Sequence, residues 1–164
     1  SSSPGRSRYN PVTQEHVIVV GGTLGLAMLS MLVHYEVSFY LRLLLERHSG
    51  FSRRARIMTL TSGLFCSHVI QIWLFGAGGW LMLELFEHTG TLGGIAHIRF
   101  LDFIYLSAAS YTTVGYGDIF PLGHIRFLFG TESLVGFMLL TWTASLTFVE
   151  IRTHWQDLED RNNR

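Results

Sequence analysis

Long apolar runs divide the chain into predicted membrane helices. They cover residues 16–33, 57–75 and 125–151, and the second run continues past the GAGG sequence at 76–79 as WLMLELF. A helix that crosses the ~30 Å hydrocarbon core of a bilayer needs about 20 mostly apolar residues. The alternative is three buried helices of a soluble bundle, but such helices usually carry a polar stripe at the helical period. These runs mostly lack one, so the pattern predicts three transmembrane helices.

The segments beside these runs complete the predicted organisation. Residues 34–48, HYEVSFYLRLLLERH, continue the first run as an amphipathic stretch that ends in charges. We therefore predict a first helix over 16–48 whose inner extension reaches into, or lies along, the membrane interface. Residues 1–15 form an N-terminal tail and residues 152–164 a short solvated tail. The chain begins with serine and not with methionine, which indicates a trimmed or partial sequence.

A fourth apolar piece lies between the second and third runs and is too short to cross the membrane and return. Its first part, about residues 101–112, contains good helix formers and small residues, and the glycines and Pro121 that follow end the helix. Non-helical backbone is tolerated at membrane depth only where it is buried in protein or lines a water-filled cavity. Residues 101–118 are therefore predicted to be a re-entrant pore helix followed by extended backbone, within an all-α membrane protein.

Composition agrees with this class and excludes others. The chain of 164 residues is one domain by length, 48% of its residues are hydrophobic, and only 15% are charged. Twelve basic residues balance twelve acidic ones, which argues against nucleic-acid binding. The sequence has neither a paired nucleophile and base nor a set of side chains at metal-ligand spacing. We therefore expect no enzymatic activity and no cofactor.

The arginines indicate how the helices are oriented. Arg47, Arg53, Arg54 and Arg56 lie in the link between the first two runs, whereas the region between the second and third runs is mainly acidic. Because cytoplasmic loops of membrane proteins carry an excess of Lys and Arg, this link is predicted to be cytoplasmic. The chain would then be a multi-pass protein of the cell membrane, with its N-terminus outside and its C-terminus in the cytoplasm.

The sequence YTTVGYGD, which ends at Asp118, is typical of a backbone that is itself the binding surface. Glycine adds nothing to a packed core, but it permits dihedral angles that other residues avoid. A potassium ion gives up its water shell when oxygens replace it, and backbone carbonyls can do this if they point at one axis. Thr113 adds a hydroxyl at the inner end, while Val114 and Tyr116 point away and pack the loop against its scaffold. Thr112 and Asp118 are predicted to support the loop, and Asp118 also attracts cations at its outer mouth.

The TTVGYGD sequence resembles the signature of potassium channels, where four T-V-G-Y-G loops form the selectivity filter. As in their pore domain, it stands between an outer and an inner helix, and the resemblance covers about residues 57–151. The extra first helix looks like that of short prokaryotic potassium channels with one pore loop. The resemblance implies that the ion-binding residues of the selectivity filter are Thr113, Val114, Gly115, Tyr116 and Gly117, with potassium held at the first four.

Two further positions take their meaning from this resemblance. Gly136 falls where the inner helix of the family often has a hinge glycine, although a site of close helix packing is an equally good interpretation. Ala109 stands where some relatives carry an acid behind the filter. We therefore do not carry over the family's filter inactivation to this chain.

One pore loop cannot close a four-fold ring, so the chain is expected to assemble as a homotetramer in the lipid bilayer. The implied function is a potassium-selective channel that conducts K⁺ passively. One alternative is a non-selective cation channel, since selectivity also depends on how the filter is packed. The other is a non-conducting subunit that modifies a partner channel.

Two ionisable residues inside the apolar runs lie at matching depths. Counting ~1.5 Å per residue, Glu132 and His68 are each about 12 Å from the outer edge of the membrane core. We expect a hydrogen bond or ion pair between them, because intramembrane charges usually have a partner. The alternative is that Glu132 bonds to the pore helix near Ser110 or Thr112, and that His68 only packs.

Overall fold

The computed structural model describes residues 14–47, 50, 52–86 and 88–162. Most of the predicted N-terminal tail, and the last two residues of the predicted C-terminal tail, lie outside these residues. The described part of the chain forms four helices and two short strands, in the order α1 (Gln14–Arg47), α2 (Arg53–Leu85), β1 (Gly90–Gly93), α3 (Phe100–Tyr111), β2 (Phe120–Gly123) and α4 (Arg126–Asn162).

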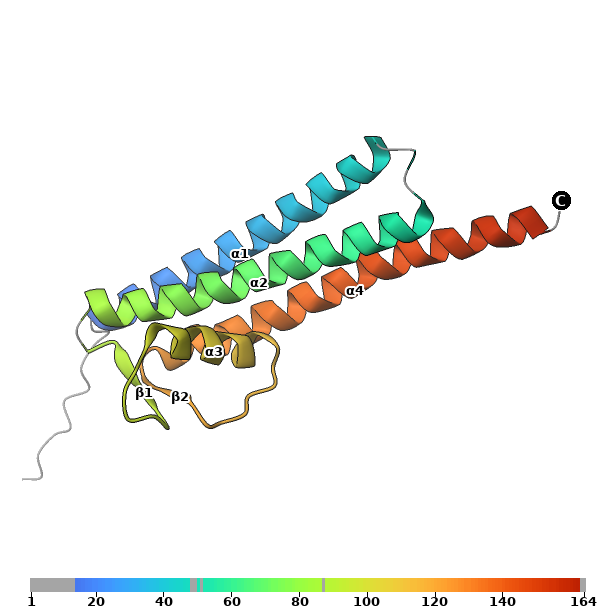
Figure 1. Cartoon of the computed structure of the whole chain (residues 1–164). Coiled ribbons are helices and arrows are strands. Elements are labelled where there is room, and N and C mark those ends of the chain that lie inside the picture. The colour runs from blue at the N-terminus through green and yellow to red at the C-terminus, as the bar shows by residue number, and fades with distance from the viewer. Residues whose placement is uncertain (1–13, 48–49, 51, 87, 163–164) are drawn as a thin grey trace, which may run out of the picture.

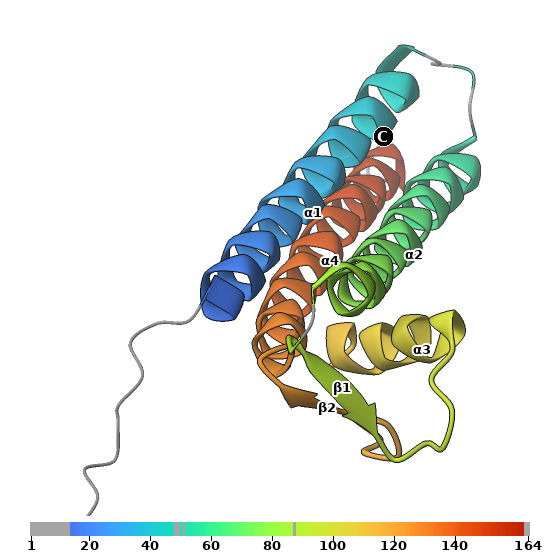
Figure 2. The ribbon, with the colours of Figure 1, turned by 90° about the vertical axis from the view of Figure 1, so that its left-hand side faces the viewer.

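The long helices α1, α2 and α4 run side by side, as Figure 1 and Figure 2 both show. α3 and the two strands lie at the end of this bundle where α2 ends and α4 begins (Figure 1). At the opposite end α4 extends beyond the other two helices (Figure 1). The end of α1, with Arg47, and the start of α2, with Arg54 and Arg56, are therefore at the end of the bundle that is farther from α3.

Each of the long helices can cross a membrane by its length and composition. Within the described residues the candidate spans are Gln14–Arg47, Arg54–Leu85 and Arg126–Arg152. α1 has 34 residues, so at ~1.5 Å per residue it is about 51 Å long and exceeds the ~30 Å hydrocarbon core. α3 has 12 residues and is only about 18 Å long, which is too short to cross. The predicted three long helices and short pore helix are confirmed.

α1 and α2 are each continuous helices. The amphipathic residues after His34 are part of the same helix as the first apolar run. α2 continues through the GAGG sequence as far as Leu85, so GAGG is not the end of this helix. Gly76 instead lets α2 approach α3 closely, because a Cβ atom there would lie 2.9 Å from the Cα atom of Ile104.

α1 buries several polar side chains and exposes many large apolar ones. On α1 the buried polar residues are Thr23, Ser30, His34 and Ser38. The exposed apolar residues of the same helix include Val17, Leu24, Met28, Leu32 and Phe39. A helix on the surface of a soluble bundle has the opposite arrangement. In a bilayer, polar residues face the interior of the bundle and apolar residues can face lipid, so this distribution supports the membrane assignment.

α3 is held at its end of the bundle by its apolar side and by its first turn. Phe103 and Leu106 join a core cluster with Phe75 of α2 and Leu128 of α4. At the start of α3, the Asp102 carboxylate accepts a hydrogen bond of 2.7 Å from the backbone N–H of Arg99. This bond satisfies a backbone donor at the helix start that has no partner within the helix. The end of α3, where the TTVGYGD sequence begins, is thereby fixed relative to α2 and α4.

The antiparallel pairing of β1 with β2 was not predicted from the sequence. Gly90 pairs with Gly123 and Gly93 with Phe120, so the chain before α3 is joined to the chain after the TTVGYGD sequence. Each strand has only four residues and contains glycine, which strands usually avoid. The protein is mostly helical, as expected, with this small sheet added at the end that carries α3.

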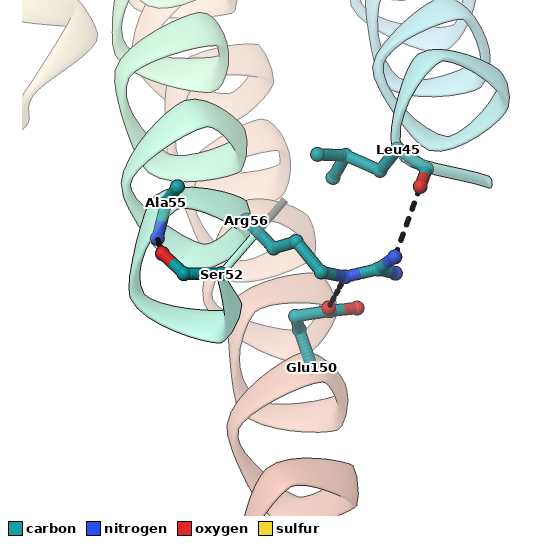
Figure 3. A network of polar contacts seen from close by, with 5 residues as sticks. All are labelled: Leu45, Ser52, Ala55, Arg56 and Glu150. Atoms are coloured by element: carbon teal, nitrogen blue, oxygen red, sulfur yellow. Dashed lines mark hydrogen bonds and ion pairs between the residues drawn. The ribbon is translucent and has the colours of Figure 1, made fainter. Parts of the chain in front are cut away.

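Arg56 joins three helices at the other end of the bundle (Figure 3). Its Nε donates to the carboxylate of Glu150 on α4 at 3.2 Å, and its Nη1 donates to the backbone carbonyl of Leu45 on α1 at 2.9 Å. Nearby, the Ser52 hydroxyl accepts a bond of 3.3 Å from the N–H of Ala55 and caps α2 (Figure 3). The two charged side chains are 30% and 29% exposed, so their ion pair contributes only about 0–1 kcal/mol.

Candidate functional site

The filter loop, residues 112–118, joins the end of α3 to the segment that enters β2. Thr113, Gly115 and Gly117 have φ angles of 60°, 54° and 79°, so every second residue of the loop is left-handed. Glycine adopts this conformation readily, whereas a threonine rarely does. Because the hand changes at each step, consecutive carbonyls can face the same side, unlike those of a β-strand. The loop thus has the backbone form that ion binding by carbonyl oxygens requires.

Backbone hydrogen bonds tie the start of this loop to the end of α3. The N–H of Thr113 donates to the carbonyl of Ser110 at 2.9 Å, and the N–H of Gly115 donates to the carbonyl of Ala109 at 3.1 Å. Thr112 donates twice to the carbonyl of Ala108, from its backbone N–H at 3.1 Å and from its hydroxyl at 2.7 Å. Carbonyls at the end of a helix have no partner within it. Here they accept from the loop and fix its position.

The side chains of the filter loop have few partners within one chain. Val114 is 54% exposed and Tyr116 is 72% exposed. Tyr116 stacks on Tyr105 of α3, with ring centroids 6.3 Å apart and planes at 11°. The expected packing of both side chains against a scaffold is therefore only partly present in a single chain.

Asp118, at the end of the loop, is bound to α3. The Tyr105 hydroxyl donates a hydrogen bond of 2.8 Å to its carboxylate. This bond is the main reason that the pKa of Asp118 lies below its ordinary value, and it also raises the pKa of Tyr105. Asp118 therefore stays ionised to a lower pH than a free carboxyl group, with its negative charge at one end of the loop.

Glu132 and His68, the predicted intramembrane pair, are not brought together. Glu132 has no exposed surface and its carboxylate contacts the hydroxyl of Ser107 on α3, which also lies 2.7 Å from the carbonyl of Ile72. His68 instead contacts the hydroxyl of Tyr111 at 2.8 Å. The two side chains thus contact different residues of α3, and the expected bond between them is replaced by a bond of His68 to Tyr111 and a contact of Glu132 with Ser107.

Gly136 lies where α4 passes closest to the end of α3. A Cβ atom at this position would lie 2.1 Å from the backbone carbonyl oxygen of Tyr111, much closer than two such atoms can approach. Glycine is therefore required for the contact between the two helices. This geometry supports the close-packing interpretation of Gly136, and nothing in it requires a hinge.

Several residues that matter at this site had not been singled out from the sequence. They are Tyr105, Ser107 and Tyr111, each of which places a hydroxyl on α3. Ser107 and Tyr111 are both buried and four residues apart, hence on one face of the helix. A signal was available, because hydroxyls at this spacing in an apolar helix usually have polar partners on neighbouring helices.

The fold and this loop together define a class of protein. Two membrane-spanning helices, α2 and α4, flank a short re-entrant helix and a glycine-rich loop, which is the arrangement of the pore domain of an ion channel. A sequence model of the ion channel family matches residues 57–152, more than half of the chain. The chain belongs to the ion channel family. Comparison with curated proteins and with solved structures gives no match.

The family match covers one part of the molecule and leaves another part outside. Residues 57–152 contain nearly all of α2, the strands, α3, the filter loop and most of α4. α1 lies wholly outside them, although it packs along both α2 and α4. The channel assignment thus rests on the part of the molecule that surrounds the filter loop, and the role of α1 is a separate question.

Proposed function

We propose that this chain is the subunit of a homotetrameric, potassium-selective channel that conducts K⁺ passively across the cell membrane. The observation that carries the proposal is the alternating sign of φ in a loop with the sequence TVGYG, tied to the end of a re-entrant helix. Potassium is held at Thr113, Val114, Gly115 and Tyr116 by backbone oxygens, with the Thr113 hydroxyl at the inner end and Gly117 completing the filter.

The open side of the filter loop supports assembly. One chain provides one loop, and a single row of oxygens cannot surround an ion. Val114 and Tyr116 are largely exposed, and so are Leu134 (67%) and Phe137 (59%) on α4. Neighbouring copies related by four-fold symmetry would bury these apolar side chains and bring four loops around one axis. Phe120 and Leu122 of β2 add to this exposed surface at the same end of the molecule.

The proposed orientation places the filter on the outer side of the membrane. Arg47 at the end of α1, and Arg54 and Arg56 in the first turn of α2, lie at the end of the bundle that is farther from α3 (Figure 1). The positive-inside rule assigns that end to the cytoplasm. The N-terminus is then outside, the C-terminus inside, and the Asp118 charges surround the outer mouth, where they attract cations from the extracellular solution.

The experiment that tests this function is ion flux into liposomes that contain the purified protein. Chemical cross-linking first establishes whether four chains associate. We expect flux that is driven by a potassium gradient, is blocked by barium, and is absent with a sodium gradient. Equal flux of both ions from a verified tetramer would contradict potassium selectivity and indicate a non-selective cation channel.

A further inference from the structure

Polar side chains from all of the described helices meet beside the end of α3. They are His34 of α1, His68 and Gln71 of α2, Tyr111 of α3 and Thr143 of α4. His34, Gln71 and Tyr111 have no exposed surface, and His68 is 8% exposed. We call these five residues the Tyr111 ring.

The contacts among the five residues form a closed cycle. Gln71 Nε2 lies 3.2 Å from His34 Nδ1, and His34 Nε2 lies 3.4 Å from Thr143 Oγ1. Thr143 Oγ1 lies 2.8 Å from His68 Nε2, and His68 Nδ1 lies 2.8 Å from the Tyr111 hydroxyl. The Tyr111 hydroxyl in turn donates to Gln71 Oε1. No member can be removed without opening the ring.

All of these bonds can be made at once if the donors run in one direction. Tyr111 donates to Gln71, Gln71 to His34, His34 to Thr143, Thr143 to His68, and His68 to Tyr111. Within the ring each residue then donates one bond and accepts one, and both imidazoles are neutral, with the proton on Nε2 of His34 and on Nδ1 of His68. The second N–H of Gln71 Nε2 donates to the Ser67 hydroxyl at 3.2 Å. The tautomers follow from this pattern of partners. The ring is thus a polar network whose donors and acceptors are matched and which is buried except at Thr143, a partly exposed residue.

A network of this kind specifies one arrangement of the helices that carry it. Leaving a buried polar group without a partner costs about 1–3 kcal/mol, and members of a network strengthen one another. Tyr111 is the last residue of α3 and immediately precedes the filter loop. Its backbone is also in contact with Gly136 of α4. Any shift of the Tyr111 side chain therefore moves the point from which the filter loop starts.

We propose that α1 is a functional part of the pore, and that His34 is a positioning residue which, through the Tyr111 ring, holds the start of the filter in its selective form. This proposal rests on the proposed potassium selectivity of the filter. It gives a role to the helix that lies outside the family match. Without His34, both Gln71 and Thr143 lose a partner, and Gln71 is one of the two residues that hold the Tyr111 hydroxyl.

The test compares the permeability ratio of K⁺ to Na⁺ in liposomes for the wild type and three variants, each verified as a tetramer. His34→Ala opens the ring, and His34→Gln keeps one donor and one acceptor. Ser30→Ala is the matched control, because Ser30 is equally buried on α1 and its hydroxyl has no partner among the described residues. We expect His34→Ala to lower the ratio about fivefold to tenfold, which corresponds to the loss of about one buried hydrogen bond.

The expected result has two further parts. His34→Gln should recover most of the wild-type ratio, and Ser30→Ala should leave it unchanged. A wild-type ratio in His34→Ala would overturn the proposal, and so would an equal fall in Ser30→Ala, which would mean that any disturbance of α1 has the same effect. If His34→Ala does not assemble, Thr143→Val opens the ring without changing side-chain shape, and Thr143→Ser should restore the ratio.

A second measurement separates failure of the ring from failure of the proposed function. Thermal unfolding of His34→Ala, Tyr111→Phe and the double variant forms a double-mutant cycle that does not depend on ion flux. The ring predicts that the shift of the double variant is clearly smaller than the sum of the single shifts. Additive shifts would overturn the ring. A wild-type protein without potassium selectivity, combined with non-additive shifts, would instead overturn the proposed function alone.

Discussion

In the filter loop, Val114 and Tyr116 are 54% and 72% exposed, whereas a few residues earlier the Tyr111 side chain has no exposed surface and contacts both His68 and Gln71. In the loop, hydrogen bonds to the end of α3 fix the backbone. The Val114 and Tyr116 side chains remain largely exposed in a single chain. Around Tyr111 the polar side chains already have hydrogen-bond partners within one chain. In the proposed channel, the folded subunit thus fixes the start of the filter, and assembly would complete the rest.

The two regions differ because the ring binds only its own side chains, whereas the filter loop is proposed to bind an ion. A ring of side-chain hydrogen bonds needs only residues of one subunit, and in a membrane it must be complete because no water can replace a missing partner. An ion on a symmetry axis needs oxygens from several subunits, so each filter loop must stay open on one side. Substitutions in the loop should therefore act on selectivity directly, whereas substitutions in the Tyr111 ring should lower stability and affect selectivity only through the position of Tyr111.

The largest effect is expected from a substitution in the filter loop itself. Gly115 has a φ of 54°, and an alanine in this left-handed conformation costs about 1–2 kcal/mol in every subunit. Gly115→Ala should abolish potassium-selective flux into liposomes while the chain still inserts and folds. Gly25→Ala on α1 is the matched control, because a Cβ atom there meets nothing within 4 Å. Selective flux in Gly115→Ala would show that the loop backbone is not the ion-binding surface.

A smaller effect, a loss of stability, is expected at Gly136, which contacts the backbone of Tyr111 between the two regions. In Gly136→Ala, the new Cβ atom would lie 2.1 Å from the Tyr111 carbonyl oxygen, so α3 and α4 must separate. Overpacking of this kind typically costs about 1–3 kcal/mol, which should appear as a lower midpoint of thermal unfolding. Gly130→Ala in the same helix, where a Cβ atom meets nothing within 4 Å, should unfold like the wild type.

The same pair of variants distinguishes close packing from a hinge at Gly136. If Gly136→Ala keeps the wild-type unfolding midpoint but alters the fraction of time for which the channel is open, the glycine acts as a hinge. In that case the contact with Tyr111 is not what makes glycine necessary.

Within the buried polar region, Ser107→Ala should reduce stability without a direct effect on the filter. The Ser107 hydroxyl contacts the Glu132 carboxylate, whose other oxygen has no partner among the described residues. Loss of the Ser107 hydroxyl leaves the buried Glu132 carboxyl group without a hydrogen bond, which lowers the free energy of unfolding by about 1–3 kcal/mol. Ser133→Ala is the control, because the bond that the Ser133 hydroxyl makes is to the Phe129 carbonyl of its own helix, at 3.0 Å. Equal stability of the two variants would mean that Ser107 does not support Glu132.

The smallest effect is expected at the outer mouth and concerns pH. Because the pKa of Asp118 is lowered chiefly by the Tyr105 hydroxyl, its negative charge persists to a lower pH than that of an ordinary carboxyl group. In Tyr105→Phe the pKa should return upward, toward its ordinary value. The acid-induced fall of potassium conductance in planar bilayers should then begin at a higher pH than in the wild type.

Tyr40→Phe provides the control for this shift, since Tyr40 is an exposed residue of α1. Its conductance should follow the wild-type pH curve. Identical curves for Tyr105→Phe and the wild type would mean that the hydrogen bond to Asp118 does not set the charge at the mouth.

The main elements of the fold could be predicted because hydropathy and length report directly on membrane spans. α1, α2 and α4 appear as long apolar runs, and α3 appears as a run too short to cross. β1 and β2 could not be found in this way, since four-residue strands with glycines carry no alternating pattern. Their pairing depends on the positions of α2, α3 and α4, which bring the two segments together.

The contacts at the site were harder to predict than its residues. Counting along a helix gives the depth of a side chain, and Glu132 and His68 do reach α3 about one turn apart. Depth does not give the direction in which a side chain points around the helix axis. That direction is set by packing, such as the approach of Gly136 to Tyr111, and it decided that His68 joined the Tyr111 ring and Glu132 joined Ser107.

The central claim is that backbone oxygens of the filter loop bind potassium in a four-fold assembly. Its most direct test is a crystal structure of the protein in a thallium salt, because Tl⁺ replaces K⁺ and is located by its anomalous scattering. We expect thallium peaks on a four-fold axis, between the carbonyl oxygens of Thr113, Val114, Gly115 and Tyr116. A four-fold assembly without thallium between these oxygens, or an assembly without four-fold symmetry, would contradict the account.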